Sequence, residues 1–310
     1  RSGITRFIFN LGKTIGFLRY ALTKGSWEEL LSLKPDIVIS AGSLVSAVNY
    51  LLSSQNGAKS ICLMKPGAGS LAKFDLAIIP QHDRRSLAFF CQSRRPASKK
   101  NEVVTEGALN LIGPDYLKEK SKRLEQSGLL KGKLLKPCIG LLIGGSAKGF
   151  SIKPEIIEAL CREIKKSALG LNASILISTS RRTPFEIEAR IKTEFAGYPN
   201  CNLLVIANEN NNPDVAGGIF GLSDIIISSP DSISMISEAV SAKKYVVVFK
   251  NDFLSPKHKL FLKLYQEKKY IYLKEISELS KSISDIWQNK PKVNFTDDNS
   301  KVAEALSKIL

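Results

Sequence analysis

The sequence predicts an α/β protein of two Rossmann-like domains, whose parallel sheets face each other across a cleft. Short apolar runs typical of buried strands alternate with segments of helical periodicity along most of the 310 residues. A strand, loop, helix and second strand follow one another from 224 to 249, which is the pattern of a βαβ crossover. A lysine-rich helix and connector at 115–136 separates the two halves. We therefore place one domain at 1–125 and the other at 126–310, with the last helix as a candidate to cross back to the first.

The charge balance indicates an anionic partner. The chain carries 45 Lys and Arg against 29 Asp and Glu, a formal net charge of +16, which suits nucleic acid, a phospholipid surface or a phosphorylated substrate. Because the lysines are scattered and no arginine-rich arm appears, dedicated nucleic-acid binding is disfavoured. No apolar run approaches the roughly 18 residues of a membrane span. These features favour a cytoplasmic protein that is peripheral to a membrane.

The cysteines indicate a reducing compartment. The chain has 5 of them, far apart and without a CxxC pair. Cys62, Cys138 and Cys201 lie in or beside apolar runs. We therefore expect buried free thiols rather than a disulfide framework.

The amino-terminal segment precedes any clear strand. Residues Thr5 to Lys24 read as a helix with an apolar stripe and accompanying basic residues; the stripe is Phe7, Leu11, Ile15, Leu18 and Leu22. We interpret it either as a core-packing helix or as a helix lying on an anionic membrane. Because an α/β domain normally starts with a strand and the first clear one is Asp36 to Ser40, we expect the first strand and loop to be missing.

His82 and Asp83 directly follow a predicted strand, Leu76 to Ile79. The carboxyl ends of parallel strands are where such sheets hold ligands. His82 is one of 2 histidines, and it is interpreted either as a hydrogen-bonded loop residue or as a general base beside Asp83. No second histidine or cysteine clusters with it in the sequence, so a metal site is not expected.

Two later strands end in residues that suit a phosphate. The first runs into Gly144 and Gly145, where backbone N–H groups can approach an oxyanion closely. This turn matches neither the P-loop nor the full GxGxxG pattern, so a purely structural turn remains an alternative. The next strand runs into Arg181 and Arg182, which suit a diphosphate or form surface ion pairs.

The βαβ unit from 224 to 249 contains the most informative loop, SSPDS. Asp231 or Ser232 can cap the helix that follows, and the free N–H groups of such a helix start attract anions. Glu238 lies about two turns into this helix. It is interpreted either as a solvated surface residue or as an acceptor of two hydrogen bonds from a sugar diol. His258, in a lysine-rich stretch, is expected to be solvated.

Six segments, taken together, resemble the mitochondrial-fission ELM family over about residues 34 to 270: PDIVISAG, FDLAIIPQHDR, EGAL, LLIGGSAKGF, STSRRTP and SPDSISMISEA. That family is itself similar to GT-B glycosyltransferases, above all peptidoglycan N-acetylglucosaminyltransferase and lipid-A-disaccharide synthase. In the former, a GGSxGA loop cradles the diphosphate and a helix-borne Glu holds the ribose hydroxyls. Here GGSAKG and Glu238 are similar. The family's amino-terminal DGKxGxxxQ-like loop is absent, which leaves the catalytic base unassigned.

The resemblance implies a GT-B-like, metal-independent glycosyltransferase without a cofactor. Its donor would be a nucleotide-diphosphate sugar bound by the carboxyl-terminal domain, and its acceptor a lipid-linked or cell-envelope molecule at an anionic membrane. The donor-site residues implied are Gly144, Gly145, Ser146, Arg181, Arg182, Ser232, Ser234 and Glu238, and the catalytic candidates on the acceptor side are His82 and Asp83. The alternative is a non-catalytic scaffold that binds a partner protein or membrane, since plant members are associated with recruiting a dynamin-related protein to mitochondria. The base, sugar and acceptor are not identified by the sequence.

Overall fold

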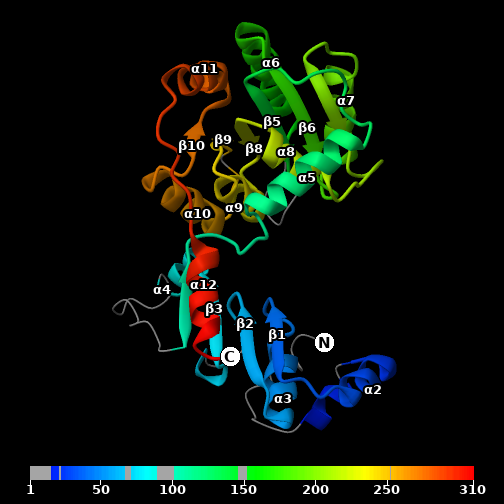
Figure 1. Cartoon of the computed structure of the whole chain (residues 1–310), viewed down its shortest axis with the longest axis vertical. Coiled ribbons are helices and arrows are strands. Elements are labelled where there is room, and N and C mark those ends of the chain that lie inside the picture. Colours follow the sequence, from blue (N-terminus) through cyan, green and yellow to red (C-terminus); the bar gives the residue numbers. More distant parts are fainter. Residues whose placement is uncertain (1–14, 21, 67–70, 89–100, 146–151, 252) are drawn as a thin grey trace. The chain divides into compact units, whose positions relative to one another are not determined.

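A computed structural model describes residues 15–20, 22–66, 71–88, 101–145, 152–251 and 253–310 (Figure 1). The chain divides into two compact units. The first contains Arg1–Gly107 and Asp298–Leu310, and the second contains Ala108–Asp297. Each unit is an α/β body around its own parallel sheet.

The first unit has a four-stranded sheet in the order β1-β2-β3-β4. Its strands are β1 (Ile37–Ala41), β2 (Lys59–Leu63), β3 (Leu76–Pro80) and β4 (Glu102–Thr105). All are paired in parallel. Its helical segments are η1 (Ile15–Tyr20), α2 (Lys24–Ser32), α3 (Ser46–Asn56), η2 (Leu71–Lys73), α4 (Gln81–Ala88) and α12 (Asp298–Ser307). β3 is buried along its whole length because β2 and β4 flank it.

The last helix packs on the first unit. The carboxylate of Asp298, at the start of α12, accepts hydrogen bonds from the N–H groups of Glu106 and Gly107, each at 2.9 Å. These bonds hold α12 to the end of β4.

The second unit has a six-stranded parallel sheet in the order β10-β9-β8-β5-β6-β7. Its strands are β5 (Cys138–Ile143), β6 (Ser174–Thr179), β7 (Cys201–Val205), β8 (Ile225–Ser228), β9 (Tyr245–Phe249) and β10 (Tyr272–Lys274). The helical segments are α5 (Pro114–Gln126), α6 (Pro154–Leu171), α7 (Phe185–Phe195), α8 (Val215–Leu222), α9 (Ile233–Ser241), α10 (Pro256–Glu267), η3 (Ile276–Glu278) and α11 (Leu279–Asn289). The strand order reverses between β5 and β8, and such switch points are where open α/β sheets bind ligands.

Helices cover both faces of this sheet (Figure 1). Along β5, Leu141 belongs to the core packed under α6, α7 and α11, and Leu142 to the core packed under α5, α8, α9 and α10. Alternate strand residues thus point into two apolar layers, which explains the continuous apolar runs in the sequence. The α/β class with parallel sheets is confirmed.

The unit boundary lies at Gly107, earlier than residue 125, because α5 packs on α8 of the second unit. Side chains of Ser121 and Leu124 fill the space where Gly221 and Gly218 lack a Cβ. The connector helix is therefore part of the second unit, while residues 298–310 return to the first.

Two residues of the amino-terminal stripe, Phe7 and Leu11, lie outside the described residues. The described part is not one continuous helix, since η1 ends at Tyr20 and α2 begins at Lys24 with Thr23 as its N-cap. Leu18 is fully buried and packs with Leu51 and Leu22. For Leu18 and Leu22, the two stripe residues in this cluster, the packing agrees with the core-packing interpretation.

The described cysteines are buried free thiols, as predicted: Cys62, Cys138, Cys161 and Cys201. Burial raises the pKa of each thiol, so all four stay protonated at neutral pH. Cys91 lies outside the described residues.

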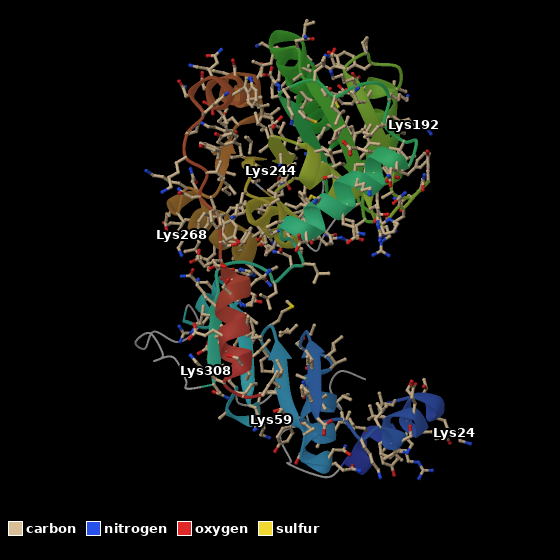
Figure 2. The ribbon with its side chains drawn as sticks, in the orientation of Figure 1. Lys24, Lys59, Lys192, Lys244, Lys268 and Lys308 are labelled. Atoms are coloured by element: carbon tan, nitrogen blue, oxygen red, sulfur yellow. The ribbon has the colours of Figure 1, made fainter. Side chains whose placement is uncertain are left out.

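Basic side chains are spread over both units, as the labelled lysines in Figure 2 illustrate: Lys24, Lys59 and Lys308 in the first, and Lys192, Lys244 and Lys268 in the second. No helix in the described ranges is long and apolar enough to span a bilayer.

Candidate functional site

Three loops of the second unit meet at the carboxyl ends of β5, β6 and β8. The N–H of Gly144 donates to Oγ of Ser229 at 2.7 Å. The hydroxyl of Thr183 donates to the carbonyl of Gly144 at 2.6 Å. Since these loops follow neighbouring strands at the switch point, the geometry defines the candidate site.

The two glycines are required by close approach of the other loops. A Cβ on Gly144 would collide with the carboxylate of Asp231. A Cβ on Gly145 would collide with the backbone carbonyl of Arg182. Because the group in the way is backbone, no rotamer change can relieve the collision that a side chain at Gly145 would cause.

Asp231 lies at the centre of this junction with a side chain that is 0% exposed. Its Oδ2 accepts the N–H of Gly145 at 3.0 Å, and Nη2 of Arg182 lies 4.0 Å from the same oxygen. Its Oδ1 has no hydrogen-bond partner in the part of the chain that the structure describes. The N–H groups of Gly144 and Gly145, which the sequence suggested for a diphosphate, are therefore already paired within the protein.

The start of α9 offers unpaired donors next to this junction. Ser232 is the N-cap, as predicted, and its Oγ accepts the N–H of Met235 at 3.4 Å. Across the described ranges, nothing accepts the N–H groups of Ile233 and Ser234, and Ser234 is exposed. A helix start with free N–H groups favours an anion.

The two arginines after β6 are both exposed. The side chain of Arg182 is 56% exposed, and its proximity to Asp231 places it beside the start of α9. Arg181 has no ion-pair partner in the described segments. Both guanidinium groups are thus available to an anion.

Glu238 is half-buried in the second turn of α9. Burial raises the pKa of its carboxyl to about 7. No hydrogen bond or ion pair to this carboxylate exists within the residues that the structure describes. Its neighbour Ser237, by contrast, accepts the N–H of Ala108 at 3.1 Å. Glu238 is therefore a partly desolvated acceptor without a donor.

His258 is half-buried, which corrects the expectation of a solvated residue. Its Nε2 lies 2.9 Å from the carbonyl oxygen of Asp231, and its Nδ1 lies 2.7 Å from Oγ of Ser255. Ser255 also caps α10, accepting the N–H of His258. The Ser-Pro pair three residues before His258 was the sequence signal for this cap. Nothing in the sequence indicated the contact with Asp231.

His82 and Asp83 belong to the first unit, where they occupy the first turn of α4 directly after β3. His82 is 2% exposed and Asp83 is 9% exposed, and His82 Nε2 lies 4.0 Å from Asp83 Oδ1. His82 is thus an enclosed helical residue, not a loop residue. A role as general base requires its surroundings to move.

The structure brings together Gly144, Gly145, Arg182 and Ser232 around Asp231, with Ser234 and Glu238 on the same helix. Ser146 lies outside the described residues. Asp231 and His258 are the members of the junction that sequence reasoning did not select as site residues. In the described ranges, no three His, Cys, Asp or Glu side chains gather as a metal site.

Sequence comparison matches the family model described as Mitochondrial fission ELM1 to residues 13–309. An uncharacterized protein of Rickettsia prowazekii (strain Madrid E) is 27% identical over 259 residues, which cover 76% of this chain and 71% of that protein. The mitochondrial fission protein ELM1 of Arabidopsis thaliana is 24% identical over 249 residues, 76% of this chain and 56% of that protein. The chain thus spans little more than half the length of the Arabidopsis relative.

Among solved structures, UDP-GlcNAc 2-epimerase from Neisseria meningitidis, bound to UDP-GlcNAc, is similar with a TM-score of 0.57 and 14% sequence identity. The likeness covers 96% of this chain and 82% of the epimerase. At this identity it shows the fold alone, which is GT-B-like with Rossmann-like units, as the resemblance implied.

Proposed function

This chain belongs to the mitochondrial fission ELM1 family, and from that premise we propose that it is a GT-B-type glycosyltransferase whose donor is a nucleotide-diphosphate sugar. The second unit binds the nucleotide at the start of α9. The acceptor is a lipid-linked or cell-envelope molecule. The net charge of +16 supports an anionic membrane as the surface where the acceptor is met.

Glu238 is the observation that carries the proposal. A partly buried carboxylate without a donor is a desolvated acceptor, and such a group is stabilised when a ligand supplies hydroxyl donors. The two vicinal hydroxyls of a ribose fit the two oxygens of one carboxylate. Binding of the diol to the ionised form lowers the pKa of Glu238 from about 7.

The diphosphate lies between the start of α9 and the two arginines. Ile233 and Glu238 are five residues apart, about 7.5 Å along the helix axis, and we assign the diphosphate to the first position and the ribose to the second. Free N–H groups and guanidinium groups are the donors that proteins use for phosphate oxygens. Both kinds of donor are present here: in the described chain nothing accepts the N–H groups of Ile233 and Ser234, and the exposed guanidinium of Arg182 has only a 4.0 Å contact with Asp231.

These donors supply the catalytic electrostatics. The acceptor oxygen attacks the anomeric carbon, the bond from that carbon to the diphosphate oxygen breaks, and the nucleoside diphosphate leaves with the electron pair. Fixed N–H and guanidinium groups stabilise the charge that develops on the leaving group. The acceptor proton passes to a base, for which His82 of the first unit is our candidate, with Asp83 Oδ1 4.0 Å from its Nε2. Transfer lost in a His82→Asn variant that still binds nucleotide supports this assignment, and unchanged transfer opposes it.

The second candidate is a non-catalytic scaffold, and the buried carboxylate of Asp231 beside the glycine turn favours it. That carboxylate occupies the N–H of Gly145, a group that would otherwise face a leaving diphosphate. Calorimetric titration with UDP, UDP-GlcNAc and other nucleotides tests the donor site, and a turnover assay then separates the candidates. UDP-GlcNAc is included because the epimerase neighbour is bound to it. Binding with release of UDP in the presence of a membrane extract supports the transferase. Binding without turnover supports the scaffold, and no binding of any nucleotide refutes the donor site.

A further inference from the structure

The open edge of β10 carries unpaired backbone groups. β10 is at one end of the six-stranded sheet and pairs with β9. The carbonyl of Lys274 accepts the N–H of Lys250, the residue after β9, at 2.8 Å. In a parallel ladder, alternate residues face opposite sides, so the N–H and carbonyl of Leu273 face away from β9. No partner for them exists in the chain that the structure describes.

A groove follows this edge. One cavity of about 540 Å³ is lined by β10, by residues at and just past the carboxyl end of α10, and by the segment 291–294. A second, of about 400 Å³, lies between β10 and α11. Both are lined by Tyr272, Lys274 and Pro291, so the two cavities adjoin along the strand. The smaller one also has the acidic residues Glu278 and Asp285 in its lining, so the groove meant below is the larger cavity. Figure 1 shows the chain after α11 passing β10, and this segment contributes Pro291, Lys292 and Asn294 to the lining of the larger cavity.

The larger cavity is basic. Lys269, Lys274 and Lys292 line it, and none of its lining residues is acidic. Within the described chain, none of these three ammonium groups has an ion-pair partner. Nearby Lys250 and Lys263 do, with Glu275 and Glu267 respectively. A groove with free strand donors and free cations is complementary to an extended chain that carries carboxylates.

We propose that this groove binds an acidic segment of a partner protein in extended conformation, added to the sheet as a strand beside β10. The backbone of Leu273 supplies the ladder hydrogen bonds, and the three lysines pair with carboxylates on alternate residues of the segment. β10 has 3 residues, about 10 Å of strand, so the contact needs only a few residues of the partner. Charge alone would attract any polyanion, but the unpaired edge selects an extended peptide.

The test measures fluorescence anisotropy of a labelled peptide of alternating Glu and Val, about eight residues long, with the full chain. Combined Lys269→Glu, Lys274→Glu and Lys292→Glu substitutions are expected to weaken binding roughly tenfold, the sum of several exposed ion pairs. Combined Lys122→Glu, Lys133→Glu and Lys166→Glu substitutions make the same charge change on exposed lysines outside the groove. Equal weakening by both sets, or no binding by the wild type, overturns the proposal.

Peptides N-methylated at odd or at even residues separate strand addition from charge attraction. Each of the two peptides keeps every carboxylate but lacks the N–H groups along one edge of its extended chain. The peptide whose blocked edge faces β10 is expected to bind at least tenfold more weakly. If both N-methylated peptides bind as tightly as the unmethylated peptide, strand addition is overturned. Saturating UDP-GlcNAc and Glu238→Ala are expected to leave peptide binding unchanged. Competition by the nucleotide would place the peptide elsewhere and also overturn the proposal.

Discussion

Nε2 of His258 lies 2.9 Å from the carbonyl oxygen of Asp231, and this one bond holds the loop after β8 against the start of α10. Because a carbonyl can only accept, Nε2 carries a proton. Desolvation lowers the pKa of the ring and so favours its neutral form, in which Nδ1 accepts from the hydroxyl of Ser255. Asp231 in turn accepts the N–H of Gly145, so the chain of bonds runs from α10 to the glycine turn.

His258→Ala is expected to destabilise the second unit by about 1–2 kcal/mol, because the carbonyl of Asp231 and the hydroxyl of Ser255 lose a partner. The pH dependence has a definite sign. The folded pKa lies below the ordinary value of 6.5 because burial, Lys257 and Arg182 outweigh Asp231 and its carbonyl. The contribution of neutral His258 to the stability of the second unit is complete above about pH 6.5 and is lost as pH falls through the folded pKa.

Urea denaturation at several pH values measures this effect. His258→Gln cannot be protonated, so the difference in unfolding free energy between wild type and this variant is expected to shrink as pH falls below 6.5. A difference that is constant from pH 8 to pH 5 would contradict a neutral, bonded His258.

Gly145→Ala is expected to cost on the order of 2–3 kcal/mol of stability, because its Cβ would collide with the backbone carbonyl of Arg182. Gly170 in α6 is a matched control, since a Cβ there meets nothing within 4 Å. Gly170→Ala is expected to stabilise by up to about 1 kcal/mol through helix propensity. Thermal unfolding of both variants measures these changes in stability. Equal changes in the two variants would mean that Gly145 does not lie against the backbone of Arg182.

The alternation of strands and helices could be predicted because each buried strand has to be continuously apolar, as β5 and β8 are. The Ser232 cap and the phosphate-suited turns are likewise local patterns. The roles of Asp231 and His258 could not be predicted, because their bonds join residues 86 and 27 positions apart that nothing local pairs. The same holds for the unit boundary, which depends on α5 packing against α8.

Arg182→Ala is expected to weaken UDP binding about tenfold while leaving uridine binding unchanged, because in the proposed site its exposed guanidinium pairs with the diphosphate and not with the nucleoside. Arg162→Ala, on the exposed face of α6, removes the same charge away from the site. Calorimetry with UDP and uridine distinguishes the two. Equal loss for UDP and uridine would show a structural effect of Arg182, and no loss would remove it from the site.

Membrane association is expected to be electrostatic, because the chain carries a net charge of +16 and Leu18 of the apolar stripe is buried. Each basic residue near an anionic surface contributes about 1 kcal/mol, and salt screens this attraction. Cosedimentation with anionic liposomes is therefore expected to fall steeply as salt rises. Equal binding to neutral liposomes, or none to either, would contradict the peripheral assignment.

The ionised carboxylate of Glu238 is expected to lower the stability of the free protein and to raise its affinity for nucleotide. Its folded pKa of about 7 lies above the ordinary 4.5, so ionising it in the free protein is unfavourable. A raised folded pKa stabilises at low pH, and this stabilisation is lost as pH rises from 4.5 through 7. Glu238→Gln is therefore expected to be more stable than wild type at pH 8 and equally stable near pH 4, as measured by denaturation.

Nucleotide affinity has the opposite dependence, because the ionised carboxylate is the form that accepts both ribose hydroxyls. Affinity for UDP is expected to rise with pH through about 7 in the wild type and to be flat in Glu238→Gln. Glu238→Ala removes two charge-assisted bonds, and with solvent competition a loss of about 2 kcal/mol, roughly thirtyfold, is expected at pH 8. A deoxyribose analogue should bind wild type poorly and discriminate little in either variant. Glu238→Ala binding every nucleotide as tightly as wild type would refute the donor site, because no other described carboxylate of α9 can replace it.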